Sequence, residues 1–385
     1  MTRKISVLIS VLVLLSVLAS ACSSPATPTP ASSEGQSAQP VQTVIVTVEV
    51  PAQAPAGQAP VAAAPSGYGE TLKTVQDRGK LICGVNSQVP GFGYVDSAGN
   101  FSGFDVDYCR ALAAAVFGDS TKVEYRPVTA SERFTALQSG EIDVLSRNTT
   151  WTLARDTELN GNFTHTTFYD GQGMMVPKDS GITKLEDLNG ATICVQTGTT
   201  TELNLADVMA ARNIAYTPAV YQDADGTFNA YQQGRCDAVT TDKSGLVARR
   251  AVLPDPANHV ILDETMSKEP LGPMVRHGDD QWFDIAQWTV YTLIAAEEYK
   301  ISSQNVDDVK ANTANPEVKR ILGVEGEMGA KLGLSNDFAY NIIQQVGNYA
   351  EVYDRNLGPD TPTYIPRGLN NLYTNGGIMY APPFR

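Results

Sequence analysis

A pattern of short apolar runs that alternate with amphipathic stretches occurs twice along the chain. This pattern limits the possible folds more than any other sequence feature. Apolar runs at 80–85, 122–127 and 142–145 alternate with helix-like stretches at 104–116 and 131–139. The alternation returns at 191–196, 202–213, 216–220, 228–234 and 237–241. Each βαβαβ unit indicates an open, largely parallel sheet with helices on both faces. Two units predict a two-lobed α/β protein whose ligand site is the cleft between the lobes.

The first residues have the pattern of an export signal. Arg3 and Lys4 precede an apolar run at 5–18, which is too short for an ordinary membrane span, and small residues lead from there to Cys22. These small residues resemble the cleavage box of bacterial lipoproteins, in which the cysteine is lipidated and becomes the first residue. The sequence therefore predicts a signal peptide at 1–21, a lipid anchor on Cys22, and an extracytoplasmic chain tethered to the cell membrane.

The segment from Cys22 to residue 68 has the composition of a linker. It is rich in Pro, Ala, Ser, Thr and Gln and nearly free of charge, so it cannot bury enough apolar surface to fold. No later segment offers about 18 uninterrupted apolar residues, so the rest of the chain is not expected to cross the membrane. We expect a spacer at 22–68 and a folded part at 69–385.

Charge and histidine content exclude several classes of partner. The formal net charge is −14, and removal of 1–21 takes away two basic residues and no acid. An acidic surface of this size argues against nucleic acid and anionic lipid as partners. The three histidines are dispersed, and no pair of cysteines has the spacing of a zinc site, so neither a metal nor another cofactor is expected. The chain is expected to be a monomer.

Four cysteines follow Cys22, namely Cys83, Cys109, Cys194 and Cys236. An even number in an exported chain favours disulfides, and four cysteines allow three pairings, among which the sequence does not decide. The first two belong to the first βα unit and the last two to the second. One bridge inside each lobe is the favoured arrangement.

The segment Ser146–Arg155, SRNTTWTLAR, follows an apolar strand-like run. An arginine can hold a carboxylate with two parallel hydrogen bonds, and the neighbouring amide and hydroxyl groups supply further donors and acceptors. The segment therefore suits a small carboxylate ligand. The alternative is a strand end followed by a helix in which Thr152 is the N-cap and Arg155 is solvated.

The second unit has two polar sites of its own. Thr199 and Glu202 have the spacing of a capping box, and the N-terminus of the helix that follows can receive an anion. Asp242, at the end of the last strand of this unit, is placed to accept hydrogen bonds from an ammonium group. Alternatively, it caps the helix that starts near Ser244. Together with Ser146–Arg155, these groups are what a zwitterionic α-amino acid requires.

The chain resembles solute-binding protein family 3, and within it the general L-amino-acid-binding proteins that serve ABC importers. The resemblance covers nearly the whole of 69–385. It rests on segments that occur in the same order as in the family: 81–85, 103–111, 147–152, 169–173, 198–204, 234–237, 269–272 and 347–351. It implies the two-lobed periplasmic-binding-protein fold of type II, with the ligand between lobes.

The resemblance also implies a role for each polar residue of the site. The family's carboxylate-binding arginine falls on Arg155, its hydroxyl partner on Thr150, and the preceding polar ligand on Asn148. Thr200 falls where a backbone N–H of the second lobe meets the carboxylate. Asp242 falls where the ammonium group is held.

The resemblance implies less directly which residues contact the side chain of the ligand. Arg133 matches a position that reaches the ligand's side-chain carboxylate in similar binders of acidic amino acids, and the alternative is a surface arginine. Asn86 and Val89 stand where other relatives carry an acid and an aromatic residue, which argues against a preference for basic amino acids. Phe92 or Tyr94 is expected to wall the pocket.

The same resemblance divides the chain into lobes. Lobe 1 is expected at 69–171 and 272–385, lobe 2 at 172–271, with crossings near 169–173 and 269–273. The expected function is extracytoplasmic binding of L-amino acids, polar or acidic and across a broad range, by closure of the lobes, with delivery to the permease of an ABC transporter.

Two other functions stand beside this one. A sensor that hands its signal to a membrane receptor uses the same ligand site. A dehydratase-like enzyme on the same scaffold is less favoured, because the sequence has no nucleophile elbow, zinc-binding helix or phosphate loop, and no histidine in the expected cleft. The chain is therefore not expected to be an enzyme.

Overall fold

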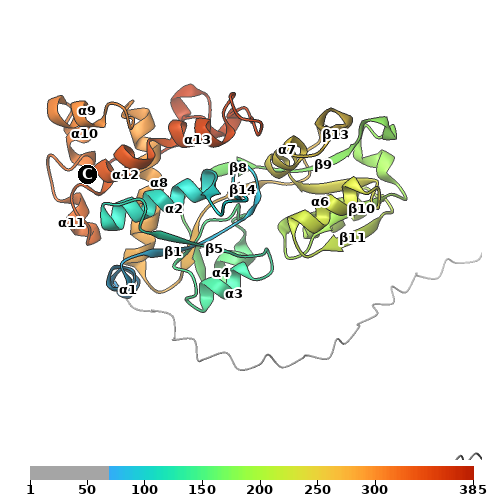
Figure 1. The fold of residues 1–385 in the computed structure, drawn as a ribbon, viewed down its shortest axis with the longest axis horizontal. Coiled ribbons are helices and arrows are strands. Elements are labelled where there is room, and N and C mark those ends of the chain that lie inside the picture. The colour runs from blue at the N-terminus through green and yellow to red at the C-terminus, as the bar shows by residue number, and fades with distance from the viewer. Residues whose placement is uncertain (1–68) are drawn as a thin grey trace, which may run out of the picture. The chain divides into compact units, whose positions relative to one another are not determined.

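Two five-stranded sheets carry the fold, and the computed structural model describes residues 69–385, which build them. The predicted signal peptide, Cys22 and the linker lie outside the described residues. Figure 1 shows one sheet with α2 and α8 beside it and the other with α6 and α7, joined through β8 and β14. The first part is called lobe 1 and the second lobe 2.

The sheet of lobe 1 has the order β5-β1-β6-β15-β7. Its strands are β1 (Leu81–Val85), β5 (Val123–Pro127), β6 (Val144–Leu145), β7 (Gly161–Phe163) and β15 (Met274–Arg276). β1 pairs in parallel with β5 and β6, whereas β15 is antiparallel to β6 and β7. A small antiparallel sheet, made of β2 (Gln88–Val89), β3 (Gly93–Val95) and β4 (Phe101–Ser102), extends this lobe.

The sheet of lobe 2 repeats this plan with the order β11-β10-β12-β9-β13. Its strands are β9 (Gln172–Pro177), β10 (Thr192–Gln196), β11 (Thr217–Tyr221), β12 (Ala238–Asp242) and β13 (His259–Ile261). β10 is parallel to β11 and β12, and β9 is antiparallel to β12 and β13.

Both sheets are therefore mixed, which differs from the prediction of largely parallel sheets. The reason lies in the two segments that cross between the lobes, because each of them enters its lobe at the carboxyl ends of the parallel strands. Gln172, the first residue of β9, pairs with Asp242, the last residue of β12. Met274, the first residue of β15, pairs with Leu145, the last residue of β6. A strand that starts at that edge must run antiparallel to its neighbour.

The crossings pair with each other as a two-stranded antiparallel ribbon of β8 (Phe168–Asp170) and β14 (Glu269–Leu271). Most helices belong to lobe 1. They are α1 (Glu70–Arg78), α2 (Phe104–Phe117), α3 (Arg133–Gln138), α4 (Leu153–Thr157), α8 (Asp280–Glu298), α9 (Val306–Asn312), α10 (Pro316–Ile321), α11 (Met328–Leu332), α12 (Phe338–Val346), α13 (Tyr349–Leu357), η4 (Gly368–Asn370) and η5 (Tyr373–Asn375). Lobe 2 has α5 (Thr200–Ala211), α6 (Ala224–Gln232), α7 (Lys243–Ala251), η1 (Lys178–Ser180), η2 (Leu185–Leu188) and η3 (Pro256–Asn258).

Side-chain alternation explains why helices cover both faces of the sheet in lobe 2. Met174 and Val195 belong to one buried cluster, whereas their chain neighbours Met175 and Cys194 belong to another. Successive residues of a strand point to opposite faces, so a strand that is apolar throughout needs a core on each side. In lobe 1 the C-terminal helices extend one large core, in which Tyr349 and Tyr353 are each 1% exposed.

The disulfides confirm the favoured pairing of one bridge in each lobe. Cys83 on β1 is bonded to Cys109 on α2, with 6.1 Å between their Cα atoms. Cys194 on β10 is bonded to Cys236, just before β12, with 5.7 Å between Cα atoms. The first bridge ties β1 to α2, and the second ties β10 to the turn that leads into β12.

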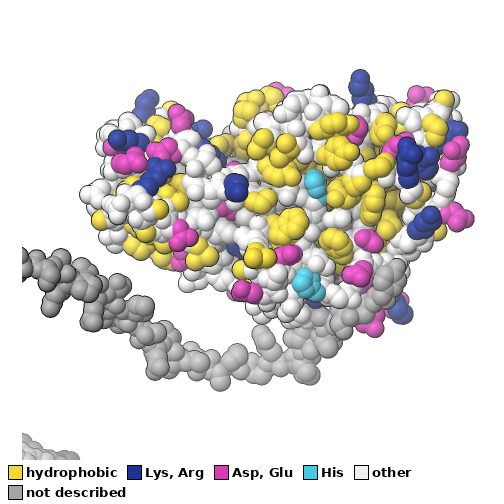
Figure 2. Space-filling view, turned by 180° about the vertical axis from the view of Figure 1, so that it is seen from behind, with side chains coloured by type: hydrophobic (Ala, Val, Ile, Leu, Met, Phe, Trp, Pro, Cys, Tyr) yellow, Lys and Arg dark blue, Asp and Glu magenta, His cyan; other side chains and the backbone are white. Residues whose placement is uncertain are grey.

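Charged side chains are scattered over the described surface. On the face seen in Figure 2, the acidic and basic side chains occur in small groups with apolar side chains between them. No helix among residues 69–385 is long and apolar enough to cross a membrane. These residues also contain no group of three or more His, Cys, Asp or Glu side chains placed to hold a metal ion.

Candidate ligand-binding site

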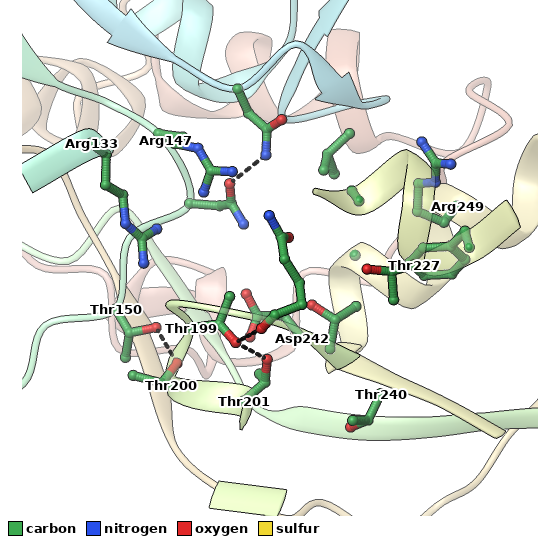
Figure 3. Close-up of a pocket in the computed structure, with 18 residues that line it drawn as sticks. Arg133, Arg147, Thr150, Thr199, Thr200, Thr201, Thr227, Thr240, Asp242 and Arg249 are labelled. Carbon is green, nitrogen blue, oxygen red and sulfur yellow. Dashed lines mark hydrogen bonds between the residues drawn. The ribbon is translucent and has the colours of Figure 1, made fainter. Parts of the chain in front are cut away.

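A pocket, which we call the cleft pocket, is lined by residues of both lobes. From lobe 1 come Asn86, Val89, Arg133, Arg147, Asn148 and Thr150, and from lobe 2 come Gln196, Thr199, Thr200, Thr201, Ala224, Thr227, Phe228, Thr240, Thr241, Asp242, Gly245 and Arg249. Figure 3 shows Arg133 and Arg147 on one side, Arg249 on the opposite side, and Thr150 beside Thr200. The lining lies where the parallel strands of both sheets end, as the sequence predicts for an α/β cleft.

A cluster of hydroxyl groups bridges the lobes at the floor of this pocket. Thr150 Oγ1 and Thr200 Oγ1 lie 3.3 Å apart, and they donate to Glu269 Oε2 at 2.5 and 2.8 Å respectively. Glu269 Oε1 accepts from Asn204 Nδ2 at 2.8 Å and from the Ser267 hydroxyl. Since each threonine gives its only hydroxyl hydrogen to Glu269, its lone pairs remain to accept from a ligand.

The carboxylate of Asp242 is buried and accepts no hydrogen bond from the described residues. It occupies the N-cap position of α7, but its side chain makes no capping bond, so the alternative prediction of a simple cap is not met. Burial, together with the carboxylates of Asp170 and Glu269, holds the pKa of Asp242 well above the ordinary value of 3.8. A carboxylate in this setting is stabilised by an incoming cation.

Arg133 is the complementary case, a buried guanidinium without a carboxylate partner among the described residues. Its side chain is in α3 and is 3% exposed, with Nη1 3.5 Å from Thr149 Oγ1 and Nη2 3.4 Å from Gly198 O. Its Nε atom is buried and has no hydrogen-bond partner. Burial, with Arg155 and Arg147 nearby, holds the pKa of Arg133 well below its ordinary value. Arg133 is therefore not the solvated surface arginine of the alternative prediction.

Asn86 and Asn148 line the pocket as expected and bond to each other. Asn86 Nδ2 donates to Asn148 Oδ1 at 3.1 Å, and the Asn148 N–H donates to Asp105 Oδ2 at 2.6 Å. Asn148 has a φ of 30°, in the left-handed region that asparagine tolerates better than most residues. Burial raises the pKa of Asp105, just behind this loop, to about 7.

Three residues expected at the site, Phe92, Tyr94 and Arg155, do not line the pocket. Phe92 is 1% exposed and packs in the lobe 1 core, with its ring centroid 5.1 Å from that of Phe168. Tyr94 is 40% exposed and also lies outside the lining. The apolar wall is instead formed by Val89 and Phe228. Phe92 lies in the turn between β2 and β3, where side chains do not alternate as they do on a strand, so no local pattern revealed that its ring enters the core.

Arg155 is buried behind the lining rather than solvated. It is 8% exposed, and its Nη1 donates to Thr150 O at 2.9 Å. Thr152 does cap α4, accepting from the Arg155 N–H, so this part of the alternative prediction is correct. Burial lowers the pKa of Arg155 to about 10. Within 69–385 its side chain makes no other hydrogen bond, its guanidinium lies 5.2 Å from the centroid of the Phe134 ring, and the residue is absent from the pocket lining.

Sequence reasoning missed three residues that shape the site. Arg147 lines the pocket, and its Nε donates to Val128 O at 2.8 Å. Because it adjoins Asn148, the argument from the segment Ser146–Arg155 could have included it. Arg249 enters from α7 with no local signal in the sequence. Glu269 was recognised only as part of a hinge motif, although it is 1% exposed and orders the threonines.

Residues 81–305 match the family model of bacterial extracellular solute-binding proteins, family 3. The chain is 56% identical over 317 residues to the general L-amino acid-binding periplasmic protein AapJ of Rhizobium johnstonii, which covers 82% of this chain and 93% of the relative. It is 55% identical over 316 residues to the glutamate/glutamine/aspartate/asparagine-binding protein BztA of Rhodobacter capsulatus, with 82% and 93% covered.

Among solved structures, a periplasmic binding protein from Brucella ovis with glutathione bound is 50% identical to this chain. It has a TM-score of 0.80, and the match covers 82% of this chain and 99% of that one. This likeness confirms the predicted two-lobed fold, and relatives named as binding proteins bear out the prediction that the chain is not an enzyme. The chain belongs to family 3 of the bacterial extracellular solute-binding proteins.

Proposed function

We propose that this chain binds L-amino acids in the cleft pocket, with a preference for acidic ones and their amides, and delivers them to the permease of an ABC transporter. The observation that carries the ligand preference is the pair of buried charges, Arg133 and Asp242, which act on each other only through space and form no ion pair among the described residues. Buried charges are stable only when paired, so a ligand that brings both an ammonium and a carboxylate satisfies them together. Relatives that bind L-amino acids, among them glutamate and aspartate, support this assignment.

The α-amino acid group is assigned to the floor of the pocket. The ammonium group donates to Asp242 and to the free lone pairs of Thr150 Oγ1. The α-carboxylate accepts from the N-terminus of α5 at Thr200 and from Arg155, which stands behind Thr150. Thr150 thus serves the ammonium group rather than the carboxylate, because Glu269 already takes its hydrogen. Arg133 and Asn148 then face the ligand's side chain.

Closure follows from the two-lobed site. We assign residues 69–171 and 272–385 to lobe 1 and 172–271 to lobe 2, with β8 and β14 as the hinge. The ligand contacts from Thr200 and Asp242 exist only when lobe 2 lies over lobe 1, so binding stabilises the closed form by its differential affinity. A permease that recognises the closed form receives loaded protein in preference to empty protein.

Calorimetric titration of the purified chain, refolded to strip carried ligand, tests this function. We expect micromolar binding of L-glutamate, L-aspartate, L-glutamine and L-asparagine, and rejection of D-glutamate and of glutarate, which lacks the ammonium group. No binding by any of the twenty L-amino acids contradicts the amino-acid function and favours the sensor reading with another ligand. Equal binding of glutarate contradicts the ammonium assignment alone.

A longer ligand is a second candidate, favoured by a side compartment of the pocket. It shares Asn86, Arg147 and Gln196 with the cleft pocket and reaches Glu132 and Asp223 at the edge of the cleft. Its cavity volume is about 110 Å³, several times the volume of one water molecule in the liquid. The relative with glutathione bound, which contains a γ-glutamyl group, supports such a ligand. γ-L-Glutamylglycine is added to the titrations as the test. It is rejected if the pocket ends at the ligand's side chain, and it binds if the pocket continues into the side compartment.

We further propose that Cys22 carries a lipid anchor, from the signal-peptide pattern that precedes it. Mass spectrometry of the N-terminal peptide from membranes is expected to show a diacylglyceryl-modified Cys22 as the first residue. An unmodified N-terminus at another residue contradicts the anchor.

A further inference from the structure

One contact between the lobes lies beside the cleft pocket rather than in it. Gln88 is on β2 of lobe 1 and does not line the cleft pocket. Its Oε1 accepts hydrogen bonds from the backbone N–H groups of Ala224 and Asp225, at 3.1 and 3.3 Å. These two residues are the first of α6, a helix of lobe 2. A side chain of one lobe therefore meets the N-terminus of a helix in the other.

The first N–H groups of a helix have no partner within the helix and need one from elsewhere. In α6 the N-cap Asp223 satisfies only one of them, since its Oδ1 accepts from Gly226 N at 2.7 Å. Gln88 supplies the acceptor for the two that precede it. The cap of α6 is thus completed across the cleft, and separation of the lobes leaves these two groups to water.

Arg249 makes a second contact between Gln88 and lobe 2. Its Nη1 donates to Gln88 O at 2.8 Å and to Asp225 Oδ1 at 2.6 Å, and Arg249 also lines the cleft pocket. On the lobe 1 side, the Gln88 N–H donates to the side-chain oxygen of Asn86, another lining residue. Gln88 is therefore held in place by residues that line the cleft pocket, whereas Gln88 itself lines the side compartment and not the cleft pocket.

We propose that Gln88 is an interlobe clasp, a positioning residue that sets how long the protein stays closed over any ligand it accepts. This inference rests on the proposed function, because it takes closure as the step that retains the ligand. The clasp is made only when the lobes are together, so its free energy adds to that of the closed form whatever the ligand is. Its loss must therefore weaken all ligands by one common factor and leave their ranking unchanged.

The test is Gln88→Ala in the whole chain, titrated with L-glutamate and with L-glutamine. The dissociation constants for both are expected to rise by the same factor, about three- to tenfold, from the modest net worth of two neutral hydrogen bonds. The rise is expected in the dissociation rate, with no fall in the association rate. Gln88→Glu is expected to restore binding, since a carboxylate accepts both bonds and is favoured at a helix N-terminus. Gln76→Ala, on the exposed face of α1, is the matched control.

Unchanged affinity in Gln88→Ala, or a loss confined to one of the two ligands, overturns the clasp. Amide hydrogen exchange by NMR, with both proteins saturated with L-glutamine so that the lobes are closed, tests the contact directly, whereas failure of the proposed function shows itself as the absence of any binding in the titration. In Gln88→Ala the amides of Ala224 and Asp225 are expected to exchange faster, whereas that of Gly226, capped within lobe 2, keeps its rate. Equal rates at all three amides in the two proteins also overturn the clasp.

Discussion

Replacing Arg133 with methionine is expected to weaken the binding of L-glutamate and L-aspartate by about 2–5 kcal/mol, which is a loss of at least about 30-fold. The guanidinium is buried, makes two long contacts to Thr149 and Gly198, and lies 4.8 Å from the centroid of the Phe134 ring, with no carboxylate in hydrogen-bond contact among the described residues. A ligand carboxylate that arrives there is desolvated with it, and removal of the arginine leaves that carboxylate buried and unpaired. L-glutamine, which brings no side-chain charge, is expected to lose much less.

Stability separates this binding role from a structural one. Methionine keeps the apolar stem of Arg133 and removes a buried charge without a partner, so the free energy of unfolding in the ligand-free protein is expected to stay constant or rise. Arg235→Met, at an exposed position of lobe 2, removes the same formal charge away from the pocket lining and serves as the control. Equal losses for L-glutamate and L-glutamine in Arg133→Met contradict the assignment of Arg133 to the side-chain carboxylate.

Replacing Asp242 with asparagine is expected to weaken every L-amino acid by about 2–5 kcal/mol, because each brings the same ammonium group. Glutarate, which lacks that group and binds far more weakly, is titrated at high concentration as the reference ligand whose weak affinity is expected not to fall. Titration of L-glutamine and glutarate against both proteins measures the difference. If the two ligands lose affinity equally, Asp242 does not hold the ammonium group.

The raised pKa of Asp242 gives this site a pH dependence of definite sign. In the free protein, burial and the carboxylates of Asp170 and Glu269 favour the protonated form, whereas a bound ammonium group favours the charged form and lowers the pKa. Binding therefore releases a proton, and affinity falls as pH falls through the free-state pKa of Asp242, which lies above 3.8. L-glutamine is the suitable probe between pH 5 and 8, since its side chain does not titrate. Asp242→Asn is expected to flatten the profile.

The local pattern of the sequence determined which segments become strands and helices. The short apolar runs and the amphipathic stretches between them placed β1, β5, β10, β11 and β12 within one or two residues of where they lie. These signals are local, because they depend only on which residues of one segment can share a buried face. The favoured pairing of the cysteines agrees with the same units, since each bridge joins two residues of one unit.

The motif at 146–155 and the turn at 196–202 identified the floor of the pocket from sequence, but the partners of each group did not follow from it. Whether Thr150 offers a hydrogen or a lone pair depends on Glu269, which is 119 residues away in the chain. Similarly, Arg249 comes to Gln88 from 161 residues away. No segment carries a signal for such contacts, because they arise only when both lobes are folded and closed on each other.

What the sequence by itself determined is therefore the class of fold, the two lobes and the chemistry of a zwitterion site. The tertiary structure alone decided which charges remain without partners. Arg133 and Asp242 are ordinary surface residue types, and only burial in a shared cleft makes their charges costly enough to demand a ligand. Phe92 shows the converse, since this aromatic residue of the turn between β2 and β3 packs in the lobe 1 core and not in the pocket wall.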